Sequence, residues 1–70
     1  MKAKFNLKDY VEETITGFTG RITAIAFYVD REPMYLIENI DTTNRPIDYW
    51  YGESRIELLG LPKLYGGEEE

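Results

Sequence analysis

The chain has 70 residues, a net charge of −5 at pH 7 and 43% apolar residues, and it contains no cysteine and no histidine. This length suits one domain, because a chain this short buries only about 60% of its unfolded surface. The missing residue types exclude Ser-His-Asp and Cys-His nucleophiles and the common zinc sites. The lack of cysteine, of a signal-peptide pattern and of a membrane-spanning apolar stretch predicts a cytoplasmic protein with no membrane partner.

Three of the thirteen acidic residues form the C-terminal run Glu68, Glu69 and Glu70. Without this run the balance of charges is 8 − 10 = −2, so the rest of the chain is nearly neutral. We expect residues 60–70 to form an extension with a solvated acidic tail, and residues 1–8 to form a flexible N-terminal segment. Because basic residues are outnumbered, the chain lacks the positive stripe that firm nucleic-acid binding needs, and no nucleic-acid partner is expected.

A period of two in the apolar residues begins at Tyr10 and predicts strands over residues 10–15 and 21–30. The glycines of residues 16–20 permit the positive φ angles of a tight turn between these strands. On the second strand the alternation assigns one set of side chains to the core face, Ile22, Ala24, Ala26 and Tyr28. The outer face then carries three apolar side chains, Ile25, Phe27 and Val29.

Three further strands are predicted over residues 34–39, 47–51 and 55–59. Turns at residues 30–33 and 41–46, each with a proline, separate the middle strands, and one helical turn at residues 52–54 precedes the last strand. We expect the last strand to return beside the first and close the sheet, since closure removes exposed edges. The sequence therefore predicts an all-β domain over residues 9–59, a small five-stranded SH3-like barrel.

Seven segments or positions carry a distinctive pattern: Thr16-Gly17-Phe18-Thr19-Gly20, Arg21-Ile22-Thr23-Ala24, Tyr28, Tyr35-Leu36-Ile37, Pro46, Trp50-Tyr51-Gly52-Glu53 and Arg55-Ile56-Glu57-Leu58. Over roughly residues 7–58 this pattern resembles a loosely defined set of small phage and mobile-element proteins with an SH3-like barrel. The resemblance implies the fold, a mobile-element origin and the cytoplasm of a host cell. That set tends to carry charged residues at the outward positions of Ile25 and Phe27, so the apolar side chains here are a departure from its pattern.

In fold and size the chain is also similar to the plasmid-type dihydrofolate reductases, in which four short barrels surround a shared pore. That family lines its pore with a Val-Gln-Ile-Tyr run, and the nearest segment here, Ile47-Asp48-Tyr49-Trp50, does not reproduce it. No catalytic residue is carried over from this similarity. We therefore expect no enzymatic activity, no cofactor and no metal site.

The outer row Ile25, Phe27 and Val29 is the strongest functional indication in the sequence. Burying such a row would stabilise association by very roughly 1.5–3 kcal/mol per large side chain. Tyr49 and Tyr51 add to this surface if Trp50 packs into the core, which we expect from its size. An open alternative is that a strongly bent sheet buries both faces of this strand under the C-terminal residues 61–65.

These features predict a non-catalytic protein-interaction module that binds a second copy of itself, as a homo-oligomer, or binds a host protein. The alternative function is an acidic inhibitor that occupies the nucleic-acid-binding site of a host enzyme. Such an inhibitor would use the acidic residues Glu12, Glu13, Glu38, Glu68, Glu69 and Glu70. Salt would weaken its binding, because exposed charges are screened within about 10 Å.

Overall fold

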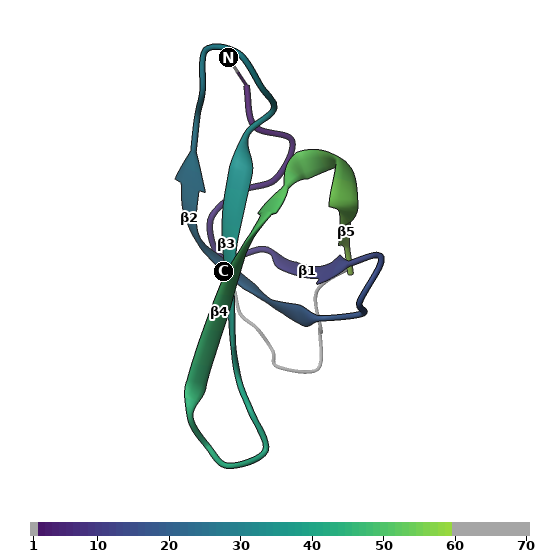
Figure 1. The fold of residues 1–70 in the computed structure, drawn as a ribbon, viewed down its shortest axis with the longest axis vertical. Helices are drawn as coiled ribbons and strands as arrows, with labels where there is room; N and C mark the ends of the chain where they lie inside the picture. The colour runs from purple at the N-terminus through teal and green to yellow at the C-terminus, as the bar shows by residue number, and fades with distance from the viewer. Residues whose placement is uncertain (1, 60–70) are drawn as a thin grey trace.

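The computed structural model describes residues 2–59, which form one five-stranded antiparallel sheet and one short helical turn (Figure 1). The elements in chain order are β1 (Tyr10–Glu13), β2 (Thr19–Ala26), β3 (Met34–Ile40), β4 (Pro46–Gly52), the 3₁₀ turn η1 (Glu53–Arg55) and β5 (Ile56–Leu58). The strand order across the sheet is β4-β3-β2-β1-β5, so β5 lies beside β1 as predicted. The all-β class, the five strands and the helical turn before the last strand are confirmed.

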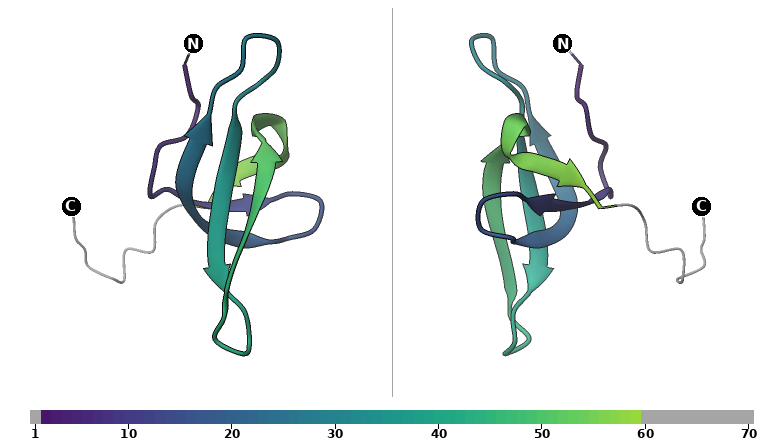
Figure 2. Two further views of the ribbon diagram at one scale, coloured as in Figure 1. Left: turned by 60° about the vertical axis from the view of Figure 1, so that its left-hand side comes forward. Right: turned by 90° about the vertical axis from the view of Figure 1, so that its right-hand side faces the viewer.

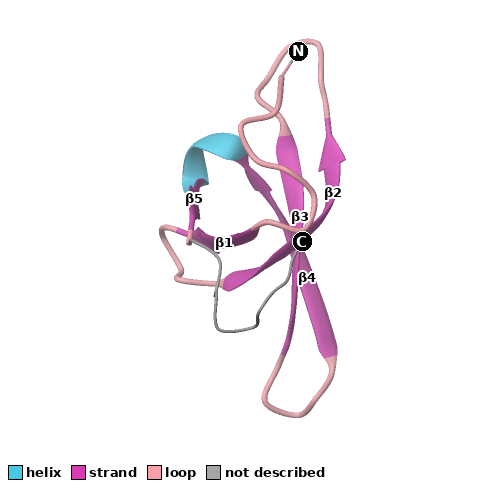
Figure 3. Cartoon of the chain, turned by 180° about the vertical axis from the view of Figure 1, so that it is seen from behind, coloured by secondary structure: helices cyan, strands magenta, loops and turns pink. Residues whose placement is uncertain are grey.

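The sheet is strongly twisted. Strands β3 and β4 run side by side, and β1 runs across their direction (Figure 2). Strand β2 links the two orientations because it pairs with both β1 and β3. The turn η1 then carries the chain from the end of β4 to β5, at the other edge of the sheet (Figure 3). The Thr14 N–H donates to the Arg55 carbonyl at 2.8 Å, which ties this crossing to the end of β1.

A β-bulge in β2 changes which side chains face the core. The pairing of β2 with β3 shifts at Thr23, so that Ile22 lies opposite Ile37 and Ile25 lies opposite Tyr35. A bulge inserts one residue and reverses the phase of the strand beyond it. The predicted outward position of Ile25 is therefore wrong, since its half-buried side chain packs against the core.

The same phase change moves the small residues of β2 to the outer face of the sheet. Ala24 lies opposite Leu36, and Ala26 lies opposite Met34, so neither alanine shares a face with the buried residues as the strict alternation required. Trp50 of β4 also lies opposite Leu36, and 47% of the tryptophan is exposed. The expectation that this tryptophan fills the core is wrong, because the register of β4 turns it to the outer face.

The core is a small cluster that draws on four strands and the N-terminal segment: Phe5, Val11, Ile22, Tyr35, Ile37 and Ile56. Strand β2 approaches β3 closely at the edge of this cluster, because Gly20 has no side chain there. A Cβ at Gly20 would clash with the backbone carbonyl of Glu38. The absence of a side chain at this position therefore allows the two strands to pack closely.

The N-terminal segment, expected to be flexible, is part of the fold. The Phe5 ring is buried and meets the Tyr35 ring edge-on, with 5.4 Å between the ring centres. The Lys4 N–H donates to the Tyr35 hydroxyl at 3.1 Å and to Glu53 Oε2 at 2.9 Å, and the Tyr35 hydroxyl donates to the same carboxylate oxygen at 2.6 Å. Burial raises the pKa of Tyr35, and the hydrogen bond from its hydroxyl lowers the pKa of Glu53.

The strand ends agree with the predicted ranges better in the second half of the sheet than in the first. Strand β2 ends at Ala26, short of residue 30, whereas β3 and β4 lie within one residue of prediction. In the β3–β4 turn, Asp41 Oδ1 accepts hydrogen bonds from the amides of Thr43 and Arg45, both at 2.9 Å. The predicted extension and acidic tail at residues 60–70 lie outside the described residues.

Candidate interaction site

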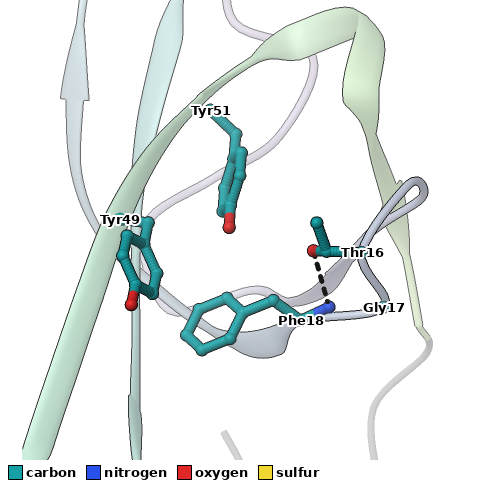
Figure 4. A pocket seen from close by; sticks show the side chains of 5 residues that line it. All are labelled: Thr16, Gly17, Phe18, Tyr49 and Tyr51. Atoms are coloured by element: carbon teal, nitrogen blue, oxygen red, sulfur yellow. Dashed lines mark hydrogen bonds between the residues drawn. The ribbon is translucent and has the colours of Figure 1, made fainter.

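An open cleft of about 380 Å³ lies between the β1–β2 connection and β4 (Figure 4). The connection contributes Thr16, Gly17 and Phe18, and β4 contributes Tyr49 and Tyr51. Figure 4 shows the Phe18 side chain extending from the connection towards the two tyrosines of the strand. Residues about thirty positions apart in the sequence therefore form one aromatic surface, the aromatic cleft.

Backbone hydrogen bonds fix the connection that carries Phe18. The Gly17 N–H donates to the Glu13 carbonyl at 2.8 Å, and the Glu13 N–H donates to the Phe18 carbonyl at 2.7 Å. The φ angle of Gly17 is +82°, in the left-handed region that favours glycine. The Phe18 N–H also donates to Thr16 Oγ1 at 3.3 Å, the contact drawn in Figure 4. An ordered turn thus presents the Phe18 ring.

Strand β4 places Tyr49 and Tyr51 on one face, because alternate residues of a strand share a face. They lie opposite Ile37 and Tyr35, so they extend the core face of the sheet towards its edge. The Phe18 ring centre is 5.3 Å from that of Tyr49, edge-on, and 6.2 Å from that of Tyr51. Tyr49 remains 52% exposed. The three rings therefore pack together and remain accessible to solvent.

A partly buried ion pair joins the β1–β2 turn to η1. The fully buried Glu13 carboxylate accepts hydrogen bonds from the Thr16 amide, the Thr16 hydroxyl and Arg55 Nε, each at 2.6 Å. Burial alone would raise the pKa of Glu13, but these hydrogen bonds lower its pKa to about 2. The Arg55 guanidinium carbon lies 5.3 Å from the centre of the Tyr51 ring. One arginine thus neutralises the buried carboxylate and supports a ring of the cleft.

The cleft offers aromatic faces and tyrosine hydroxyls, which suit an apolar ligand group with a few hydrogen-bonding atoms. Within residues 2–59, no group of three acidic residues is arranged to hold a metal ion. The carboxyls with a lowered pKa are acceptors within the fold. The Arg45 amide lowers the pKa of Asp41, and the Tyr35 hydroxyl lowers that of Glu53.

The five residues predicted to form one interaction surface lie in three places. Ile25 packs against the core. Phe27 and Val29 are 51% and 99% exposed in the connection between β2 and β3. Tyr49 and Tyr51 line the aromatic cleft, which the sequence did not predict. Ile25, Phe27 and Val29 therefore do not form the predicted continuous row, although all five side chains are exposed or half-buried.

Of the acidic residues in the alternative hypothesis, Glu12 and Glu38 lie on the outer face of the sheet, whereas Glu13 does not. Glu13 is buried and paired with Arg55, so it is not available to an outside partner. Glu12 lies opposite Glu57 across β1 and β5, and Glu38 lies opposite Arg21 across β3 and β2. The remaining members, Glu68, Glu69 and Glu70, lie outside the described residues. The proposed acidic surface thus loses a central member.

Phe18 enters the sequence prediction only as part of a glycine turn. An aromatic residue between two turn glycines is the one signal that could have marked it, because turns normally carry small and polar residues. Its partners in the cleft come from a distant strand, which no local pattern links to the turn.

Comparison with known proteins identifies no relative: no family model, no curated protein and no solved structure matches the chain. Among residues 2–59, no helix is long and apolar enough to cross a membrane. The function must therefore be argued from the geometry of the candidate site.

Proposed function

We propose that this chain is a non-catalytic protein-interaction module, built on an SH3-like barrel, that binds an extended apolar segment of a partner protein in the aromatic cleft. The resemblance described above adds a phage or mobile-element origin and a host protein as the partner. The strand order β4-β3-β2-β1-β5, with a 3₁₀ turn between β4 and β5, supports the fold part of this proposal.

One observation carries the proposal: three packed aromatic rings remain open to solvent on an ordered framework. Phe18 lies on a turn fixed by backbone bonds, and Tyr49 and Tyr51 lie on a strand. Tyrosine offers a large contact area at a small entropic cost, since only two side-chain torsions become fixed. Grooves lined by such rings bind extended, proline-containing segments, which lose little entropy on binding.

The proposal is tested by selecting peptides from a random library on the immobilised protein. We expect the enriched peptides to share an apolar or proline-containing core and to lose binding to the Phe18→Ser variant. Tyr28→Ser is the matched control, because Tyr28 is an exposed aromatic residue outside the cleft. A library with no enrichment, or peptides that bind the Phe18→Ser variant as well as the wild type, would contradict the proposal.

A further inference from the structure

The outer edge of β4 is an exposed strand edge. Among the strands that the structure describes, β4 pairs with β3 alone, over seven residues from Pro46 to Gly52. Proteins usually protect such edges with charged side chains, proline or very short strands. Strand β4 has one charged side chain, Asp48, and one proline at its start, and its other side chains are Ile47, Tyr49, Trp50 and Tyr51.

Hydrogen bonds at both ends of the β3–β4 ladder show which of its opposed residue pairs are hydrogen-bonded. At the turn, the Asp41 N–H donates to the Arg45 carbonyl at 2.9 Å. At the other end, the Glu53 N–H donates to the Pro33 carbonyl at 3.0 Å. Both pairs continue the register of the strands between them. Because bonded and unbonded pairs alternate in an antiparallel ladder, the odd-numbered residues of β4 bond to β3.

The even-numbered residues of β4 therefore direct their backbone groups away from β3. Asp48 and Trp50, two residues apart, each direct an N–H and a C=O to the outer edge, where none of the described strands pairs with them. In an antiparallel pairing, each such residue exchanges two hydrogen bonds with the residue directly opposite it on the new strand. The edge can thus accept one more strand without any change in the β3–β4 pairing.

We propose that this edge pairs antiparallel with β4 of a second copy of the chain, about a two-fold axis at Tyr49. Asp48 then lies opposite Trp50 of the second copy, so the outward backbone groups of each copy satisfy those of the other. Tyr49 lies opposite Tyr49 of the second copy, and Ile47 lies opposite Tyr51. The pairing rests on the proposed interaction function and names one partner, a second copy of the chain. In the dimer, the aromatic cleft of each copy continues across the axis.

Charge selects this register over its neighbour. An axis at Asp48 would place two carboxylates directly opposite each other, which destabilises a strand pair. The axis at Tyr49 separates the two carboxylates and places each one beside an aromatic residue. The edge is therefore complementary to itself, which a two-fold dimer requires.

The contact area sets the strength of the dimer. Tyr49 and Trp50 are 52% and 47% exposed. Because an aromatic side chain buries 150–250 Å², about 100 Å² of each of the four rings remains to be covered, or about 400 Å² in total. These four rings supply only part of the roughly 1,200 Å² of a stable interface, so we expect a weak dimer that forms at high micromolar to millimolar concentration.

Analytical ultracentrifugation across this concentration range tests the pairing. We expect a reversible monomer–dimer equilibrium for the wild type. Asp48→Pro should remain monomeric and keep the circular-dichroism spectrum of the folded sheet, because the N–H that proline removes faces away from β3. A wild type that stays monomeric at millimolar concentration, or an Asp48→Pro variant that folds and dimerises equally, would overturn the inference.

Single cysteines provide a second test, because the chain has none of its own. Opposed residues of an unbonded pair have Cα atoms about 4.5 Å apart, within disulfide range. Tyr49→Cys should therefore cross-link under mild oxidation, whereas Trp50→Cys should not. Equal cross-linking of the two variants would exclude the axis at Tyr49. The peptide selection above reads the cleft of the monomer, so it can succeed where the pairing fails.

Discussion

Replacing Phe5 with alanine tests whether the N-terminal segment belongs to the core. Phe5 is 5% exposed and packs edge-on against Tyr35. Removing a buried phenylalanine side chain costs about 3–5 kcal/mol, because apolar contact is lost and a cavity remains. A domain of this size has a free energy of unfolding of about 3.5–10 kcal/mol, so the variant should lose a large part of its stability.

Urea unfolding followed by circular dichroism measures this loss, with the slope of the transition as a check on two-state behaviour. Leu7→Ala is the matched control, since Leu7 lies in the same segment and is 55% exposed. We expect the control to change the free energy of unfolding by less than about 0.5 kcal/mol. If Phe5→Ala costs no more than Leu7→Ala, the segment is not part of the core and the packing described above is incorrect.

Three further changes probe the turn and the strand contacts. Gly20→Ala should cost about 1–3 kcal/mol in urea unfolding, because its Cβ clashes with the Glu38 carbonyl, and an unchanged midpoint would contradict the close approach of the strands. Gly17→Ala should cost about 1–2 kcal/mol from its positive φ and weaken peptide binding through Phe18, as titration calorimetry would show. The pKa of Glu13 is about 2, below its ordinary 4.5, so its stabilising effect is present above pH 4.5 and is lost as the pH falls towards 2. The wild type should therefore lose more of its melting temperature than Glu13→Gln between pH 6 and pH 3, and equal losses would contradict a folded state that favours the ionised carboxylate.

Period-two patterning was sufficient to predict the strands, and the need to protect sheet edges predicted that β5 lies beside β1. It failed at the bulge because Ile22, Ala24, Ile25 and Ala26 are all apolar, so the residues after Thr23 fit either phase equally well. Only the pairing with β3 decides between the phases, and that pairing depends on residues far along the chain.

The same limit applies to β4, where three consecutive aromatic residues leave the inward face undecided. The register with β3 places Tyr49 and Tyr51 on the core side and Trp50 on the outer side. The buried position of Phe5 did have a sequence signal that the prediction left unused, because Ala3, Phe5 and Leu7 alternate with polar residues. The aromatic cleft could not be predicted for the same reason as the face of Trp50, since Phe18 meets its partners only through tertiary contacts.

Titration calorimetry with one library-selected peptide, against the wild type, Phe18→Ser and Tyr28→Ser, tests the role of the aromatic cleft most directly. The proposed function predicts at least about a tenfold loss of affinity, or about 1.4 kcal/mol, for Phe18→Ser. It predicts no loss for Tyr28→Ser, whose changed residue lies outside the cleft. Equal affinity of the peptide for all three proteins would contradict the assignment of the cleft as the binding site.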